Sequence, residues 1–163
     1  MKRLRAAAAI ILVLLLLCAA LPCAVLAAGE GESHETTVLF THDLHSHFLP
    51  QTAADGRQER AQHPDALTLD GGDFSIGSLI QTLYTSKAPE LRTMGALGYD
   101  ATTAGNHEFD HEGLGFARML TAARTSGDTV PALLMANYKP SDANPDQLDI
   151  QRAMSAYGVK DYM

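Results

Sequence analysis

In the stretch Thr103–Gly113, T-A-G-N-H-E-F-D-H-E-G, residues 105–110 set a glycine, an amide, an imidazole and two carboxylates almost side by side after a β-favouring run. Two other stretches follow the same plan: Leu39–His47, L-F-T-H-D-L-H-S-H, and Leu67–Asp73, L-T-L-D-G-G-D. In each, a short apolar run gives way at once to side chains that can bind metal ions or move protons. Because the carboxyl ends of parallel strands lie at one edge of a sheet, this repetition predicts an α/β fold with a site at that edge.

The rest of the chain alternates between strand and helix patterns. Short apolar or β-branched runs predict strands at residues 36–41, 66–69, 100–104 and 130–136. Apolar residues at i, i+3, i+4 and i+7 predict helices over 76–83 and 116–123, and we expect both apolar faces to lie in the core. Pro89 can begin a further helix, with Leu91 and Met94 inward and Gly98 near its end. A weak helix is predicted over 147–157. Strands that alternate with helices indicate a largely parallel sheet.

The first residues have the composition of an export leader. Lys2, Arg3 and Arg5 precede an uncharged apolar run, residues 6–28, that is broken only by Pro22 and ends in small residues. This order is typical of a cleaved signal peptide, which we assign to residues 1–28. The alternative is an uncleaved membrane anchor, since about 18 or more apolar residues can span a bilayer. The sequence therefore predicts an exported protein, located in the periplasm, on the cell surface or outside the cell.

Charge and cysteine content narrow the class of partner. Residues 1–28 hold both cysteines, three positive charges and no negative charge, so the net charge of −7 becomes −10 for the remainder. A surface this acidic repels nucleic acid, and we expect no partner of that kind. The remainder has no thiolate ligand and no disulfide, so its stability must come from packing or from a bound ion. An anionic substrate would need a metal centre to attract it.

Three groups of residues could form such a centre. Asp43 and His45 are two positions apart, so in an extended segment both side chains share one face. Asp73 follows two glycines that allow a tight turn, and Asn106 and His107 follow another glycine in the same manner. Carboxylate, imidazole and amide ligands without a thiolate suit Mn²⁺, Zn²⁺, Fe or Ca²⁺. Asp73 could bridge two ions about 3.5–4 Å apart, the spacing of two-metal hydrolases.

The motifs D-L-H, G-G-D and G-N-H-E, in this order, resemble the first three motifs of the calcineurin-like metallophosphoesterases. Their longer forms, T-H-D-L-H-S-H-F, L-D-G-G-D-F-S-I-G-S and T-T-A-G-N-H-E-F-D, are similar to those of the exported 5′-nucleotidase branch. That branch hydrolyses nucleoside 5′-monophosphates, UDP-sugars and 2′,3′-cyclic nucleotides. The resemblance runs from about Thr37 to Asn137.

The resemblance implies a fold, a site and a substrate class. Residues 36–163 would be a partial metallophosphoesterase domain, the amino-terminal half of a four-layer αββα sandwich. His107 would contact the phosphate and protonate the leaving oxygen, and Asp110 would orient the His107 ring. The substrate would be a small phosphoester or nucleotide, and a membrane would be contacted only through an uncleaved leader. A centre of two divalent metal ions would have four ligands in this chain: Asp43, His45, Asp73 and Asn106.

Each residue also has an ordinary structural explanation. Asp43 and Asp73 could cap helices or shape turns, and His45 could be a surface histidine. We expect Glu108 to make structural hydrogen bonds around its loop, and Asp70 to shape a turn rather than bind metal. No function is assigned to four further histidines: His42, His47, His63 and His111.

The resemblance also predicts what this chain does not contain. The family has later motifs, a downstream histidine and then G-H-x-H, whereas no histidine follows His111 here. We therefore expect the amino-terminal part of a longer enzyme, inactive and poorly folded alone, with one sheet face uncovered at about 25 cal/mol per Å² of apolar area left exposed. The rival hypothesis is a non-catalytic exported module for metal binding or interaction. Within the enzyme class, a thiosulfate-ester hydrolase and a cyclic-nucleotide phosphodiesterase stay open.

Overall fold

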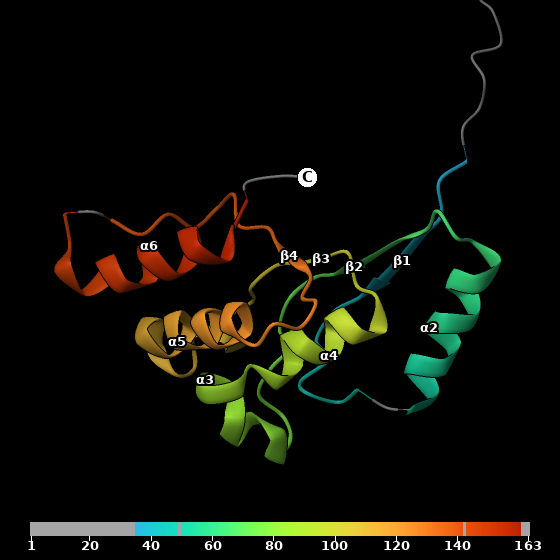
Figure 1. The fold of residues 1–163 in the computed structure, drawn as a ribbon, viewed down its shortest axis with the longest axis horizontal. Coiled ribbons are helices and arrows are strands. Elements are labelled where there is room, and N and C mark those ends of the chain that lie inside the picture. The colour runs from blue at the N-terminus through green and yellow to red at the C-terminus, as the bar shows by residue number, and fades with distance from the viewer. Residues whose placement is uncertain (1–34, 49, 142, 161–163) are drawn as a thin grey trace, which may run out of the picture. The chain divides into compact units, whose positions relative to one another are not determined.

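The computed structural model describes residues 35–48, 50–141 and 143–160. The chain divides into one unit over Met1–Glu35 and a second over Thr36–Met163, and every element labelled in Figure 1 belongs to the second. The predicted leader, residues 1–28, lies outside the described residues. Within the described residues, no helix combines the length and the apolar character needed to span a membrane.

A parallel sheet forms the centre of the second unit. Its four strands within the described residues are β1 (Val38–Thr41), β2 (Leu67–Asp70), β3 (Ala101–Thr102) and β4 (Ala132–Leu133). The strands pair in chain order, with Val38 opposite Leu67, Leu69 opposite Ala101 and Ala101 opposite Ala132. All four carboxyl ends therefore lie at the same edge. The predicted α/β class with a parallel sheet is confirmed.

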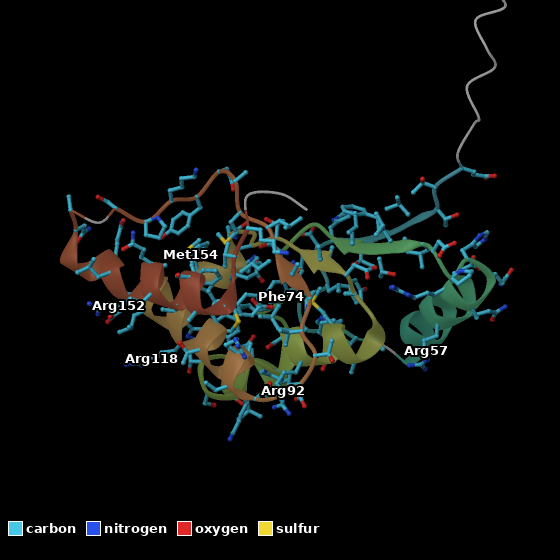
Figure 2. All side chains as sticks on the ribbon, turned by 45° about the horizontal axis from the view of Figure 1, so that its top comes forward. Arg57, Phe74, Arg92, Arg118, Arg152 and Met154 are labelled. Carbon is cyan, nitrogen blue, oxygen red and sulfur yellow. The ribbon has the colours of Figure 1, made fainter. Side chains whose placement is uncertain are left out.

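Helices connect the strands and supply most of the core. Phe74 lies in the middle of this unit, whereas Arg92, Arg118 and Arg152 lie on its outside (Figure 2). The predicted core face of the helix after β3 is confirmed, because Phe116, Met119, Leu120 and Ala123 are each at most 1% exposed. The helical elements of the described residues are α2 (Pro50–Gln62), η1 (Leu79–Leu83), α3 (Tyr84–Lys87), α4 (Pro89–Leu97), η2 (His107–Phe109), α5 (Glu112–Thr125) and α6 (Pro145–Tyr157), where η marks a 3₁₀ turn.

The helix α4 begins and ends as its sequence predicts. Pro89 occupies its first turn, where a missing N–H is tolerated, and Gly98 ends it with a φ of 87°. The Gly98 N–H caps the last turn by donating to the Met94 and Gly95 carbonyls. Leu91 and Met94 are fully buried. The amino end of α4 is thus held firmly in the core.

The prediction of a core-facing helix over 76–83 is wrong. The segment forms the 3₁₀ turn η1 and then the short helix α3, and Ile76 before them has a φ of 60°. Leu79 is 88% exposed and Leu83 is 46% exposed, while the buried side chain is that of Tyr84. In a 3₁₀ helix, side chains three positions apart eclipse each other, so the i, i+3, i+4, i+7 spacing no longer lines one face.

The helix α2 is one that apolar periodicity does not predict, because residues 50–62 have no apolar stripe. A polar contact holds it instead: the Arg60 guanidinium donates to both carboxylate oxygens of Asp100, each over 3.1 Å. Burial would raise the pKa of Asp100, but the hydrogen bonds from Arg60 and from the Thr68 N–H lower it. The ionised Asp100 thus ties α2 to the segment that enters β3.

One face of β1 and β2 is open in the described part of the chain. Val38 is 49% exposed, Phe40 is 61% exposed and Leu67, opposite Val38, is 38% exposed. Apolar side chains of β1 and β2 therefore contact solvent on this face.

Candidate functional site

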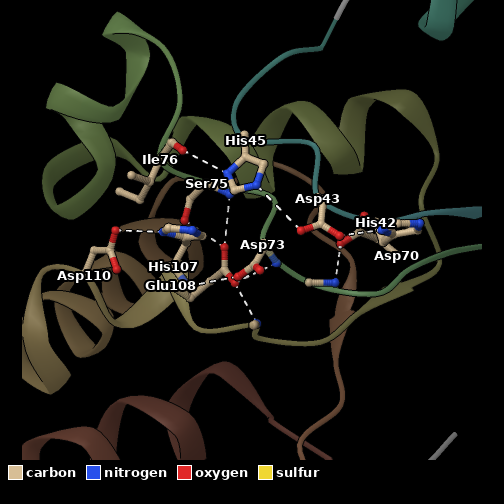
Figure 3. A network of polar contacts seen from close by, with 12 residues as sticks. His42, Asp43, His45, Asp70, Asp73, Ser75, Ile76, His107, Glu108 and Asp110 are labelled. Carbon is tan, nitrogen blue, oxygen red and sulfur yellow. Dashed lines mark hydrogen bonds and ion pairs between the residues drawn. The ribbon is translucent and has the colours of Figure 1, made fainter.

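The loops that follow β1, β2 and β3 meet at the carboxyl edge of the sheet (Figure 3). The Asp43 N–H donates to the Gly72 carbonyl over 3.0 Å, and the His45 N–H donates to the Asp73 carbonyl over 3.0 Å. The His107 N–H donates to Asp73 Oδ1 over 2.9 Å. The second loop therefore holds the first and the third, and the three predicted motifs lie together.

Two glycines allow this close approach. A Cβ atom on Gly105 would lie 2.2 Å from Asp73 Oδ1, and one on Gly72 would lie 2.6 Å from the Gly105 nitrogen. Gly72 also has a φ of 93°, which other residues rarely adopt. A larger residue at either position would push the second and third loops apart.

His45 and Asp43 face each other across a short gap. His45 Nδ1 lies 3.1 Å from the Ile76 carbonyl oxygen, which can only accept, so Nδ1 carries the hydrogen. In the neutral ring Nε2 then presents a lone pair, and it lies 3.6 Å from Asp43 Oδ1. A cation or a proton between these two atoms would relieve the repulsion of their lone pairs. Asp43 and His45 would hold a divalent ion there as oxygen and nitrogen ligands, and the Nδ1 contact is of the kind that fixes histidine ligands.

His42, which has no predicted function, contacts the other carboxylate oxygen of Asp43 through Nδ1. This hydrogen bond is the main reason that the pKa of Asp43 lies below its ordinary value; burial opposes it, and the charges of His42 and His45 add to the lowering. The Asp43 side chain is 54% exposed, so the ionised carboxylate can be reached from solvent.

His107 and Asp110 form an ordered pair next to His45. The His107 and His45 ring centres are 4.9 Å apart in an edge arrangement. His107 Nδ1 lies 2.8 Å from Asp110 Oδ2, and because a carboxylate only accepts, Nδ1 is the donor. The same hydrogen bond and the charge of Asp110 raise the pKa of His107, which favours the imidazolium form. A histidine held in this way can act as a general acid.

Asp73 is half-buried, whereas Asn106 is exposed like Asp43. Asp73 Oδ1 already accepts the His107 N–H, and Asn106 directly precedes η2, where its carbonyl accepts the Phe109 N–H over 3.0 Å. In the part of the chain that the structure describes, no three His, Cys, Asp or Glu side chains are grouped so that they could hold one metal ion. The bridging role of Asp73 and the ligand role of Asn106 stay predictions.

Glu108 organises the loops from inside. It is fully buried, and its Oε2 accepts the N–H groups of Asp73 over 3.0 Å and Gly105 over 2.7 Å. Its Oε1 accepts the Ser75 N–H over 3.0 Å and the Ser75 hydroxyl over 2.7 Å. The Tyr84 hydroxyl donates to the Glu108 carbonyl over 2.7 Å. The expected structural hydrogen bonds of Glu108 are confirmed.

Asp70 joins the ends of three strands. Its carboxylate accepts the Gly72 N–H over 3.0 Å and the hydroxyls of Thr41 and Thr102, each over 2.8 Å. Burial raises the pKa of Asp70, while these hydrogen bonds lower it in part. The prediction that Asp70 shapes the turn after β2 is confirmed.

Comparison with known proteins identifies relatives of this chain by sequence. No model of a known family matches the chain. Protein UshA of Escherichia coli (strain K12) is 34% identical over 99 residues, which cover 53% of this chain and 18% of UshA. The snake venom 5′-nucleotidase of Gloydius brevicauda is 32% identical over 141 residues, which cover 75% of this chain and 21% of that protein.

A solved structure also resembles this chain. The crystal structure of the calcineurin-like phosphoesterase YfkN from Bacillus subtilis matches with a TM-score of 0.53 at 27% identity, over 64% of this chain and 37% of that one. The chain has the metallophosphoesterase fold. Its homologues are 5′-nucleotidases and calcineurin-like phosphoesterases, as the three motifs predict, and it corresponds to their amino-terminal domain. The chain spans about a fifth of the length of UshA and of the venom enzyme.

Backbone strain is concentrated at the carboxyl edge of this metallophosphoesterase sheet. Left-handed backbone conformations in non-glycine residues cost about 1–3 kcal/mol each and cluster at functional sites, where the surroundings enforce them. Among the described residues, those of this kind in the loops after β1 and β2 are Asp43 (φ 53°), His45 (46°), Ser46 (58°), Asp73 (52°) and Ile76 (60°).

Sequence patterns do not point to two buried polar residues of this region, Ser75 and Glu90. Ser75 is fully buried and is marked only by its place beside the G-G-D motif. Glu90 follows Pro89 in the first turn of α4, where an acidic residue is common at any helix, so nothing in the sequence separates it from a surface residue. It is nevertheless 1% exposed.

Proposed function

We propose that residues 36–163 supply part of a metal-dependent hydrolase of small phosphoesters, with nucleotides of the 5′-nucleotidase kind as the leading substrate class. One arrangement carries this proposal: His45 Nε2 lies 3.6 Å from Asp43 Oδ1, and the ring of His107, which bonds to Asp110, lies 4.9 Å from that of His45. A candidate metal ligand pair and a candidate acid are thus neighbours. The 5′-nucleotidases and phosphoesterases among the relatives support the substrate class.

The donor set at this edge fits divalent ions. Asp43 and His45 would hold the first ion, and Asp73 and Asn106 would contribute to a second, of the Mn, Zn, Fe or Ca kind. When bound, such ions supply Lewis acidity that neutralises phosphate charge and makes water a better nucleophile. The chain has few cations of its own to do this, because 9 Lys and Arg stand against 19 Asp and Glu after residue 28.

His107, oriented by Asp110, would protonate the leaving group. With Nδ1 bonded to Asp110, the His107 imidazolium would give the proton on Nε2 to the departing oxygen. The Asp110 carboxylate would stabilise the positive ring before transfer and fix the tautomer after it. Asp110 would thus act through His107 and would not touch the substrate.

Export of the protein is part of the proposal. The leader composition of residues 1–28 supports it, and the venom enzyme among the relatives is by its name a secreted protein. Sequencing the amino terminus of the secreted protein tests the proposal. A mature chain that begins at Gly29 is expected, and a retained Met1 would support the anchor instead.

Titration of Mn²⁺ into the complete protein tests the metal site. We expect Asp43→Ala and His45→Ala each to weaken binding about tenfold or more, since even outer contacts of metal ligands change affinity 10–100-fold. His47→Ala is the matched control, because His47 is an exposed histidine of the same loop. Equal Mn²⁺ affinity in all four proteins would contradict the proposal.

The rival function is non-catalytic metal binding, and His107 separates the two. In the complete protein, His107→Ala should abolish release of phosphate from a nucleoside 5′-monophosphate while Mn²⁺ affinity stays within about threefold. Unchanged turnover in His107→Ala would remove the acid role, and a complete protein that binds Mn²⁺ without any turnover would favour the rival.

A further inference from the structure

Glu90 is a buried carboxyl group that the proposed chemistry does not use. It lies in the first turn of α4, is 1% exposed, and is flanked by the fully buried Leu91. Its Oε1 accepts the Ser46 hydroxyl over 2.8 Å, whereas its Oε2 is buried without a hydrogen-bond partner among the described residues. A buried carboxyl group with one oxygen that makes no hydrogen bond destabilises the core, so an apolar residue at this position would give a more stable fold.

Ser46, which bonds to Glu90, ends the turn that carries Asp43 and His45. Ser46 follows His45 directly, and its side chain is buried. All three residues have positive φ angles, 53°, 46° and 58°. Such a backbone relaxes to ordinary conformations unless neighbouring groups hold it.

The other bonds of this turn go to a loop that is itself strained. The His45 N–H donates to the Asp73 carbonyl over 3.0 Å and the Ser46 N–H to the Phe74 carbonyl over 2.8 Å. Asp73 has a φ of 52°, so one left-handed turn rests partly on another. The bond from Ser46 to Glu90 differs, because it reaches 44 positions along the chain to a helix whose first turns are packed in the core.

We infer that Glu90 is a positioning residue of the metal site: anchored in α4, it holds the Ser46 hydroxyl and thereby the turn that presents Asp43 and His45. That the turn presents metal ligands rests on the proposed function. That Glu90 holds the backbone of the turn can be measured without any metal. A glutamine at position 90 keeps an acceptor for Ser46, whereas a methionine of similar length removes it.

Amide hydrogen exchange tests whether Glu90 holds the backbone of the turn. In Glu90→Met, exchange of the His45 and Ser46 amides should speed up at least about tenfold relative to that of the Leu134 amide, which bonds to Thr102 in the sheet. Glu90→Gln should leave the ratio within about threefold. Leu91→Met, the neighbouring core position, is the control for packing changes in α4. If the exchange rates of all amides changed equally in Glu90→Met, Glu90 would contribute only to general stability, and the inference would be overturned.

A second substitution approaches the same bond from the other side. Ser46→Ala removes the donor and leaves Glu90 in place, so the inference stays testable if Glu90→Met does not fold. Ser46→Ala should speed up exchange of the His45 amide as in Glu90→Met. In the double variant this exchange should be little faster than in either single variant, because both substitutions remove the same hydrogen bond. Additive effects would show that the two residues act independently and would overturn the inference.

Titration with Mn²⁺ then tests the purpose of the turn. Glu90→Met should bind Mn²⁺ about 10–100-fold more weakly than the wild type, and Glu90→Gln should be close to the wild type. Wild-type affinity in Glu90→Met, together with faster exchange in the turn, would remove Glu90 from the metal site. No Mn²⁺ binding by the wild type would instead count against the proposed function, and the exchange ratios would still decide whether Glu90 holds the turn.

Discussion

Replacement of Glu108 by glutamine should destabilise the fold far more than its small chemical change suggests. The carboxylate accepts four hydrogen bonds, two at each oxygen, from Asp73, Gly105 and Ser75. An amide has one acceptor oxygen, so its NH₂ group must face one of these two pairs of donors. The less costly orientation turns NH₂ toward Ser75, whose hydroxyl can rotate to accept, but the buried Ser75 N–H is then left without a partner.

The magnitude follows from that orientation. One orphaned buried N–H costs about 1–3 kcal/mol, and the loss of charge on the remaining acceptor weakens two bonds by about 0.5 kcal/mol each. Glu108→Gln should therefore lower the free energy of unfolding by about 2–4 kcal/mol. With a urea m-value of about 2 kcal/mol per M, the unfolding midpoint falls by about 1–2 M.

Urea unfolding followed by circular dichroism measures this shift. Glu59→Gln is the matched control, because it makes the same chemical change at an exposed position of α2, and its midpoint should stay within about 0.3 M of the wild type. A midpoint for Glu108→Gln that equals the one for Glu59→Gln would refute the assignment of Glu108 as the acceptor that holds the loops after β2 and β3 together.

Three further predictions concern the same region. Gly105→Ala should destabilise the fold by about 1–3 kcal/mol in the same assay, because the added methyl group would lie 2.2 Å from Asp73 Oδ1. Asp110→Asn should lower the pKa of His107 in an NMR titration, since the Asp110 carboxylate is what raises it; an unchanged titration would show that the pair is not formed. Burial raises the pKa of Glu90 above its ordinary 4.5, so wild-type stability should fall as pH rises from there through the folded-state pKa. Glu90→Gln should lack this fall, and parallel pH profiles would contradict the burial of an ionisable group.

The strands and the helices α4, α5 and α6 were predictable because local pattern and tertiary structure agree in them. The spacing of Phe116, Met119 and Leu120 is that of a helix face, and α5 buries that face. Pro89 and Gly98 mark the two ends of α4 by their backbone preferences alone. The carboxyl edge was predictable for the same reason, since polar residues that directly follow buried strands have to gather there.

The remaining features depend on contacts that no short stretch of sequence contains. The apolar spacing over 76–83 predicts a helix, but the left-handed Ile76 and the buried Tyr84 turn the segment into a 3₁₀ turn with Leu79 exposed. The bond between Ser46 and Glu90 joins residues 44 positions apart, so neither residue signals its partner. The left-handed turn at Asp43 and His45 is likewise set by the neighbouring loop, although the two-residue spacing alone suggests an extended segment.

The parallel arrangement of the strands also leaves one side of the molecule free for modification. Loops that enter the strands lie at the edge opposite the one that carries Asp43 and His107. Asp65 is exposed in the loop that enters β2. Both cysteines of the sequence, Cys18 and Cys23, fall within residues 1–28, so Asp65→Cys would place a single thiol in residues 36–163. A fluorophore attached there would report on unfolding or on immobilisation without meeting a ligand at the other edge.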